Sequence, residues 1–412
     1  MRENVYRTND PEMLLRLKRQ EAEALLDVLR SINQAHLKPE HIFKIARNAL
    51  LAQCGVRKMM FTIRSDEGFR TGVRMGFRKM DDSALAELPG TLGVIPVDPE
   101  QHPRLTAYEV EWIVPVNYQN EVRAWLLVAD FAETQAELKN DLIFIETIGN
   151  VVSAAVENRN LMQEMIQQES LKRELEVAET IQRQLLPNDF AEINGAEVFA
   201  ENTAHHKIGG DYYDVISRGD RGFFVCIADV AGKGIGAALL MANLQANLHA
   251  LILSENDLRH VIEKLHKKIY AVTQGDKFVT VFLAHVRTEE KQIDYINAGH
   301  NPPLFYHGLE RKELQVGTIP LGMIDLPYLE LETVDYAAGD SIFLYTDGLV
   351  EQHNLEGVML GEEPVLARLD QLRGEGAEVV LRQMSSLYWA YAGDAVRDDD
   401  VTMMAVHFSD SE

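Results

Sequence analysis

One stretch of the sequence decides the fold of the C-terminal half, and it reads Phe223-Phe224-Val225-Cys226-Ile227-Ala228-Asp229-Val230-Ala231-Gly232-Lys233-Gly234-Ile235-Gly236. Its first six residues are apolar and rich in β-branched and aromatic types, which predicts a buried strand. Asp229 ends this strand, and the glycines after it let the backbone turn tightly and approach a ligand. Apolar residues then recur at helical spacing over 236–253, so the pattern predicts a strand, a carboxylate, a turn and a helix in succession.

The chain around this stretch alternates short β-rich runs with a few helical segments. Strands are predicted at Ala196–Ala200, Gly222–Asp229, Phe278–Val286, Lys291–Ala298, Ser341–Thr346 and Val401–Phe408. Helical spacing marks 236–253, 257–272 and 376–391. Because hairpin-linked strands with helices set apart lack βαβ alternation, we expect an α+β layered fold and not a doubly wound sheet.

Four further segments gather polar residues beside apolar runs: Ile208-Gly209-Gly210-Asp211-Tyr212-Tyr213-Asp214, Asn297-Ala298-Gly299-His300-Asn301-Pro302-Pro303, Tyr345-Thr346-Asp347-Gly348-Leu349 and Arg397-Asp398-Asp399-Asp400-Val401-Thr402. Aspartates that converge from strand ends repel one another unless a divalent cation lies among them. Ligand sets made of oxygen alone select Mg²⁺ or Mn²⁺. Two such ions can activate a bridging water and bind a phosphoryl oxygen, so the predicted chemistry is hydrolysis of a phosphate ester.

Taken in this order, the five segments resemble the metal-dependent protein phosphatase (PPM) family, in its bacterial SpoIIE-type branch. The resemblance covers about residues 175–410, and residues 174–187 are similar to the entry helix of that branch. It implies a PPM αββα sandwich of two antiparallel sheets over 188–412. It also implies a protein serine/threonine phosphatase, a phosphoric monoester hydrolase.

The resemblance also implies roles for individual residues. Asp229 matches the aspartate that bridges two metal ions, and the carbonyl of Val230 would bind one of them. Asp347 and Asp399 match two further carboxylate ligands, and Asp211 matches an aspartate with a direct or water-mediated metal contact. Catalysis would then run through metal-bound water held by Asp229 and Asp347, with two Mn²⁺ or Mg²⁺ ions and no protein nucleophile.

The sequence leaves three assignments near these ligands undecided. The ligand assignment could shift by one residue from Asp399 to Asp398, and Asp400 stands where relatives carry Asn or Asp. The eukaryotic branch has a histidine two residues after its bridging aspartate, whereas this chain has Ala231, and the SpoIIE-type branch lacks that histidine too. The proton donor is therefore unassigned, and His300 is either that donor or a turn residue.

The first 155 residues predict a separate α+β domain. Helices are expected over 11–35 and from Pro39, and strands at Lys58–Ile63, Glu111–Val116 and Arg123–Ala129, with an irregular stretch at 64–108, a hairpin turn at 117–120 and a helix from near Thr134. This order resembles a GAF-type sensor domain. The alternative is a purely structural or dimerising domain, because no ligand motif is present and the sensor's ligand or partner is unknown.

Residues 156–187 predict a coiled-coil linker helix. Apolar residues recur every three or four positions, at Leu161, Met165, Leu171, Leu175, Ala178 and Leu185, and Pro187 ends the segment. The mean step of about 3.4 residues is close to the 3.5 of a coiled coil. A homodimer joined by a parallel coiled coil is predicted, and one amphipathic helix packed on its own domain is the alternative.

Charge and composition limit the partners. The chain has 40 basic and 64 acidic residues, a net charge of −24, and residues 161–412 alone carry 20 basic and 41 acidic residues, net −21. This balance argues against binding nucleic acid or an anionic membrane. No uninterrupted apolar run of 18 residues and no signal peptide is found, so a cytoplasmic location is expected.

The expected substrate follows from the resemblance alone. Relatives of this architecture act on small phosphorylated regulatory proteins, STAS-type anti-anti-sigma factors, in partner-switching signal transduction. The alternative is a catalytically inactive, phosphatase-like dimeric scaffold. A dinucleotide site at Gly232–Ala237 is disfavoured because βαβ alternation is lacking. The pair His205-His206 is interpreted as a loop, since no third histidine lies nearby.

Overall fold

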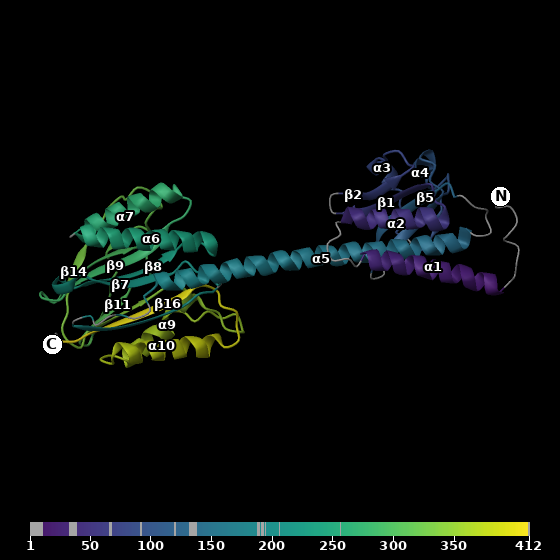
Figure 1. Ribbon diagram of the computed structural model, residues 1–412. Helices are drawn as coiled ribbons and strands as arrows, with labels where there is room; N and C mark the ends of the chain where they lie inside the picture. The colour runs from purple at the N-terminus through teal and green to yellow at the C-terminus, as the bar shows by residue number, and fades with distance from the viewer. Residues whose placement is uncertain are drawn as a thin grey trace. The chain divides into compact units, whose positions relative to one another are not determined.

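The computed structural model describes residues 11–32, 39–65, 68–90, 93–118, 121–131, 138–187, 190, 193, 195–205, 207–255 and 257–410. The chain divides into two compact units, Met1–Glu169 and Ser170–Glu412 (Figure 1). The predicted helix start near Thr134 and part of the predicted turn at 117–120 lie outside the described residues.

The N-terminal unit is built on one five-stranded antiparallel sheet in the order β2-β1-β5-β4-β3. Its elements are α1 (Pro11–Ile32), α2 (Pro39–Cys54), β1 (Lys58–Ser65), β2 (Gly68–Met75), α3 (Asp82–Leu85), β3 (Ile95–Pro96), α4 (Pro103–Ala107), β4 (Trp112–Tyr118), β5 (Glu121–Ala129) and the first part of α5 (Leu138–Leu185). One face packs on α1, α2 and α5, where Phe43 and Ile145 are buried. The other face packs on residues around α3 and α4, where Leu105 and Trp125 are buried.

The stretch 64–108 is more regular than its sequence predicts. It contains β2, α3, β3 and α4. Strand β2 is an edge strand with exposed Arg70 and Arg74, and its only neighbour is β1. Arginines on an edge strand hide the apolar alternation that marks a strand, and they discourage pairing with another chain.

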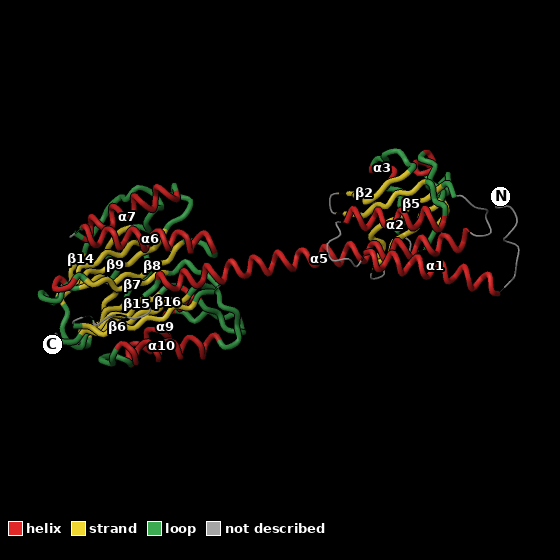
Figure 2. Tube along the Cα trace, in the orientation of Figure 1, coloured by secondary structure: helices red, strands yellow, loops and turns green. Residues whose placement is uncertain are grey.

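The C-terminal unit is a four-layer sandwich of helices, two sheets and helices (Figure 2). The first sheet has the order β13-β10-β9-β8-β7, with β14 beside β10, and the second has the order β12-β11-β15-β16-β6. The strands are β6 (Ala196–Thr203), β7 (Tyr212–Ser217), β8 (Phe223–Val230), β9 (Val279–Arg287), β10 (Gln292–Ala298), β11 (Leu304–His307), β12 (Glu310–Glu313), β13 (Gly317–Thr318), β14 (Glu332–Asp335), β15 (Ser341–Tyr345) and β16 (Val401–Phe408). The predicted pair of stacked sheets is confirmed; the pairing is antiparallel except between β10 and β13, which is parallel.

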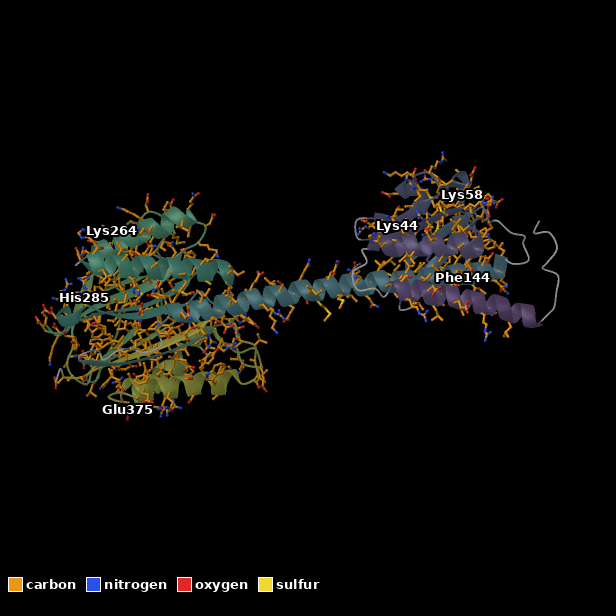
Figure 3. All side chains as sticks on the ribbon, in the orientation of Figure 1. Lys44, Lys58, Phe144, Lys264, His285 and Glu375 are labelled. Carbon is orange, nitrogen blue, oxygen red and sulfur yellow. The ribbon has the colours of Figure 1, made fainter. Side chains whose placement is uncertain are left out.

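Three apolar layers hold the sandwich together. Phe282 of the first sheet and Met404 of the second belong to one buried apolar cluster. Figure 3 shows side chains filling the space between the two sheets. The outer face of the first sheet is covered by α6 (Ile235–Ser254) and α7 (Leu258–Thr273). The outer face of the second is covered by α8 (Gly348–Glu351), α9 (Glu362–Gln371) and α10 (Ala377–Ala392). Because both sheets are covered, their strands read as near-continuous apolar runs.

Helix α6 is apolar enough by length and composition to span a membrane, with a mean hydropathy of 1.4 over its most apolar window. Its residues Leu240, Leu244 and Leu248 are buried in the core of the C-terminal unit. This packing against both the sheet and α7 accounts for apolar residues on more than one side of the helix.

Helix α5 has two kinds of apolar residue in its second half. Leu161 and Met165 are exposed, at 44% and 69% of their surface. Leu175, Ala178 and Leu185 are half-buried within the C-terminal unit. The predicted coiled-coil seam therefore divides into an exposed part and a part that packs within the chain. The helix ends before Pro187, as predicted.

Candidate metal centre

The predicted ligands come from strand ends of both sheets. Asp229 lies near the end of β8 in the first sheet, opposite Thr280 of β9. Asp347 follows β15 and precedes α8, and Asp399 precedes β16, both in the second sheet. Asp211 directly precedes β7. The fold thus brings residues separated by up to 188 positions to one end of the sandwich.

The carboxylates at this end influence one another's ionisation. Burial raises the pKa of Asp229 to about 7, and the charges of Asp347, Asp399 and Asp400 act in the same direction. Burial also raises the pKa of Asp211 well above its usual range, with Asp229 as the next cause. Burial, Glu351 and Asp399 raise the pKa of Asp347. Such mutual repulsion between buried carboxylates is what a divalent cation would relieve.

Asp211 is fixed by two hydroxyl groups that reach it from the second sheet. Its Oδ2 accepts hydrogen bonds from the hydroxyls of Thr402 at 2.6 Å and Thr346 at 2.9 Å. The Thr402 hydroxyl also accepts from the Asn202 side chain at 2.7 Å, and the Thr402 N–H donates to the Thr346 hydroxyl at 2.9 Å. The threonines of the Thr346-Asp347 and Asp400-Val401-Thr402 segments therefore position Asp211, a role that the sequence analysis missed.

The Asp400 carboxylate accepts hydrogen bonds from backbone N–H groups in and just before the Gly-Gly-Asp loop. Its Oδ2 accepts from the N–H of Gly210 at 2.7 Å, and its Oδ1 accepts from the N–H of His205 at 2.7 Å. A Cβ atom on Gly209 would lie 2.4 Å from Asp400 Oδ2, so this close approach requires glycine. Asp400 thus holds the loop that carries Asp211.

The two remaining aspartates of the triplet have different partners. Asp398 is half-exposed, and its Oδ2 accepts from the N–H of His353 at 2.8 Å, which lowers its pKa. Asp399 Oδ2 lies 2.9 Å from Nζ of Lys233, which also donates to the carbonyl of Asp398 at 2.6 Å. Asp399 acts on the ionisation of Asp229, and Asp398 is not among the causes of that shift. The geometry therefore favours Asp399 over Asp398 as the ligand.

The candidate ligands are all oxygen atoms, which suit a hard divalent cation, but their side chains are not close together. Among the described residues, no three or more His, Cys, Asp or Glu side chains are gathered closely enough to hold a metal ion. Asp399 is paired with Lys233 at 2.9 Å. The charges of Asp347, Asp399 and Asp400 nevertheless all act on the buried Asp229. Oxygen ligands of this kind suit Mg²⁺ or Mn²⁺.

His300 lies in the interior, and Thr280, which pairs with Asp229 between β8 and β9, separates it from that aspartate. It is 5% exposed, and its Nδ1 lies 2.9 Å from the hydroxyl of Thr280. Burial lowers its pKa to about 4, so the ring is neutral at pH 7. The side chain of Asn297 accepts from the His300 N–H and donates to its carbonyl, which fixes the turn. This geometry favours the turn interpretation, and it leaves the proton donor unassigned.

A side chain of α5 reaches the Gly-Gly-Asp loop directly. Nε2 of Gln182 donates to the carbonyl of Gly209 at 2.7 Å, and its Oε1 accepts from the Gly209 N–H at 3.1 Å. Only the three-dimensional structure reveals this contact, because the two residues are 27 positions apart.

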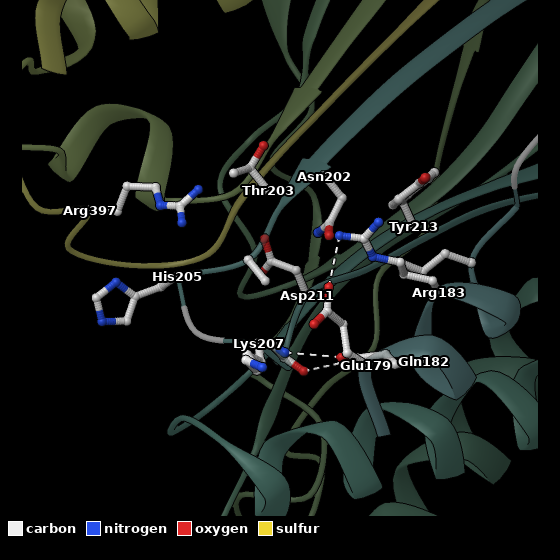
Figure 4. Close-up of a pocket in the computed structure, with 13 residues that line it drawn as sticks. Glu179, Gln182, Arg183, Asn202, Thr203, His205, Lys207, Asp211, Tyr213 and Arg397 are labelled. Carbon is white, nitrogen blue, oxygen red and sulfur yellow. Dashed lines mark hydrogen bonds and ion pairs between the residues drawn. The ribbon is translucent and has the colours of Figure 1, made fainter. Parts of the chain in front are cut away.

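A cavity of about 770 Å³ lies between the end of α5, the end of β6 and the Gly-Gly-Asp loop (Figure 4). Asp211 forms part of its wall, and so do Arg183, Lys207 and Arg397. His205 also lines this cavity, whereas His206 lies outside the described residues. The cavity is therefore polar and adjoins the carboxylate cluster through Asp211.

Comparison with known proteins agrees with this architecture. Residues 219–409 match the family model described as Stage II sporulation protein E (SpoIIE). The chain is 29% identical over 209 residues to phosphoserine phosphatase RsbU and 26% identical over 185 residues to phosphoserine phosphatase RsbP, both of Bacillus subtilis (strain 168). These matches cover 49% and 44% of this chain, and 60% and 46% of the relatives' own lengths.

One solved structure supports the fold. The SiaA-PP2C domain of Pseudomonas aeruginosa superposes with a TM-score of 0.53 at 21% identity, over 59% of this chain and 98% of that domain. The predicted two-sheet fold is therefore confirmed, and the family match places the predicted SpoIIE-type domain at residues 219–409.

Proposed function

We propose that this chain, whose residues 219–409 form a SpoIIE-type phosphatase domain of the PPM family, is a metal-dependent protein serine/threonine phosphatase. The observation that carries the proposal is the electrostatic coupling of Asp229 with Asp347, Asp399 and Asp400 across the two sheets. A divalent cation would relieve the repulsion among these carboxylates, and the similar proteins RsbU and RsbP are named phosphoserine phosphatases.

Each candidate ligand has a distinct part in holding the metal. Asp229 is the proposed shared ligand, with the Val230 carbonyl, Asp347 and Asp399 as further ligands. Asp211 is the proposed direct or water-mediated contact, held in place by its threonine partners. Two bound Mn²⁺ or Mg²⁺ ions would supply an activated water and stabilise the charge that develops on the phosphoryl group.

The proposed substrate is phosphoserine or phosphothreonine on a small regulatory protein of the STAS type. The names of the relatives support phosphoserine, and the STAS class rests on the resemblance alone. The second candidate function is an inactive dimeric scaffold. The buried hydrogen bonds that fix Asp211 argue against it, because a scaffold does not need a carboxylate held by two hydroxyls beside Asp229.

Regulation is proposed to reach the metal centre through α5. We propose a GAF-like sensor over 1–155, a linker over 156–187 and the phosphatase over 188–412. The contact of Gln182 with Gly209 supports this route, since a shift of α5 would move the loop that carries Asp211. The exposed Leu161 and Met165 support a homodimer seam. A cytoplasmic location is part of the proposal.

Phosphate release by the full chain tests the enzyme. With Mn²⁺ and a phosphoserine protein, the wild type is expected to release phosphate. The rate of Asp229→Ala is expected to be lower by a factor of about 100 or more. Asp398→Asn is the matched control, because Asp398 is bound to His353 and stands beside the proposed ligand. A wild type that binds Mn²⁺ and releases no phosphate from any phosphoserine substrate would favour the scaffold.

Light scattering tests the dimer. The double substitution Leu161→Lys and Met165→Lys is expected to give a monomer, and Glu164→Lys on the same helix is the control. If the double variant keeps the mass of a wild-type dimer, Leu161 and Met165 do not form the dimer contact.

A further inference from the structure

Arg397 is followed by three aspartates in the sequence and pairs with none of them. Asp398 accepts from the backbone of His353, and Asp399 pairs with Lys233. Asp400 accepts from backbone N–H groups of the Gly-Gly-Asp loop. Within the described residues, the Arg397 side chain has neither an ion pair nor a hydrogen bond. An arginine with acidic neighbours that all bind elsewhere is available for an anion from outside.

Arg397 faces the cavity beside the metal centre. It is half-buried, and its guanidinium group is turned toward the side of the cavity where Thr203 and Asp211 lie (Figure 4). Asp211 is 3% exposed and is part of the same wall. A group bound by Arg397 would therefore lie in a space that adjoins the carboxylate cluster.

The other two cations of this cavity already have acidic partners. Arg183 pairs with Glu179 at 2.9 Å, and Lys207 pairs with Glu176 at 2.6 Å. Residues 161–412 carry a net charge of −21, so most of this surface repels an acidic ligand. A guanidinium without a partner in such surroundings can decide where an acidic segment binds.

We propose that this cavity receives the segment of the phosphoprotein that flanks the phosphoserine, and that Arg397 binds an acidic side chain in that segment. The proposal rests on the proposed phosphatase function. The planar guanidinium can donate two parallel hydrogen bonds to a carboxylate, which gives both affinity and orientation. The volume of about 770 Å³ is within the range of pockets that enclose a ligand of several hundred daltons.

Peptide binding to the full chain tests this assignment without turnover. Two labelled peptides would carry the phosphonate analogue of phosphoserine, whose C–P bond is not hydrolysed, flanked by aspartates in one and by lysines in the other. Fluorescence anisotropy in Mn²⁺ would give both affinities for the wild type, Arg397→Glu and Arg397→Gln. Arg382→Glu is the matched control, because Arg382 is an exposed arginine of α10 that pairs with Glu378.

The wild type is expected to bind the aspartate-flanked peptide about tenfold more tightly than the lysine-flanked one. Arg397→Glu is expected to reverse this order, Arg397→Gln to remove the preference, and Arg382→Glu to keep it. The same preference in Arg397→Gln, with the variant folded as judged by circular dichroism, would overturn the proposal, and so would equal binding of both peptides by the wild type. Failure of the phosphatase function would show instead as absent phosphate release from phosphoserine substrates, which this binding assay does not measure.

Discussion

The side chain of Gln182 and the backbone of Gly209 form two reciprocal hydrogen bonds, at 2.7 and 3.1 Å. Gly209 stands two residues before Asp211, and Asp400 binds Gly210 from the other side. The loop that carries Asp211 is thus held between α5 and Asp400, which directly precedes β16. Because hydrogen bonds fix both sides, loss of either partner should be measurable at the metal centre.

Gln182→Ala is expected to lower phosphate release about tenfold and to weaken Mn²⁺ binding, with the helical content unchanged. The substitution leaves the N–H and carbonyl of Gly209 without their partner, which costs about 1–3 kcal/mol for a buried backbone group. Activity assays and calorimetric titration with Mn²⁺ measure both effects. Gln184→Ala, an exposed position on the same helix, is the control. Equal losses in the two variants would show that the contact with Gly209 has no special part.

Lys233→Gln is expected to bind Mn²⁺ more tightly than the wild type. Burial opposes the charge of Lys233, yet the hydrogen bond to Asp399 and the charges of Asp399, Asp400 and Asp347 together outweigh that effect and raise the pKa of Lys233. The ammonium therefore competes with a divalent cation for Asp399. The pair is partly exposed, so the gain is limited to about 1 kcal/mol, or roughly fivefold in affinity. Calorimetry against Lys268→Gln, an exposed lysine of α7, measures this gain, and unchanged affinity would refute the competition.

Thr402→Val is expected to lower the free energy of unfolding by about 1–3 kcal/mol, because the buried Asp211 loses a hydroxyl donor. Thr402→Ser keeps the hydroxyl and should retain most of the stability. Thr333→Val removes an exposed hydroxyl that donates to Asp294, and it should cost less than about 0.5 kcal/mol. Thermal unfolding of the four proteins in EDTA gives the comparison. A Thr402→Val protein as stable as Thr333→Val would mean that Asp211 does not depend on this bond.

Because His300 is buried as a neutral ring, we expect the stability of the protein to decrease at acidic pH. The pKa of His300 is about 4 in the folded chain, against an ordinary value of 6.5. Between these values the unfolded chain binds a proton that the folded chain does not, so stability is lost as the pH falls from 6.5 toward 4. The loss attributable to this residue is at most about 3 kcal/mol.

Unfolding of the wild type and His300→Gln at pH 7.5 and pH 5 isolates that contribution, because both proteins share every other titrating group. The wild type is expected to lose more stability than the variant over this interval. Parallel losses in the two proteins would contradict the burial of a neutral His300.

The sequence predicts the long apolar strands of both sheets and misses several shorter ones, including the fully exposed β12. Strands β8, β9, β15 and β16 are apolar runs that only a covered sheet explains. Strand β12 contains Glu310, Arg311, Lys312 and Glu313, all exposed, and no hydrophobic pattern marks it. Its position depends on pairing with β11, which is a tertiary contact.

The predicted site shows the same division between local and tertiary information. Asp211, Asp229 and Asp347 stand out because glycines or apolar strands adjoin them. The roles of Gln182, Thr402 and Lys233 depend on contacts between residues that are 27 to 191 positions apart. Sequence periodicity and motif spacing do not reveal such contacts. Sequence therefore identified the candidate metal-binding carboxylates, and the structure was needed to identify the groups that hold them.

Phosphate release from a phosphoserine protein, measured while Mn²⁺ is titrated into the metal-free full chain, tests the central claim most directly. Release is expected to rise with Mn²⁺ along the same curve as calorimetric Mn²⁺ binding, and Asp347→Asn should shift both curves to higher Mn²⁺ together. Release that persists in EDTA, or that is unchanged in Asp347→Asn, would contradict a metal centre built on these aspartates.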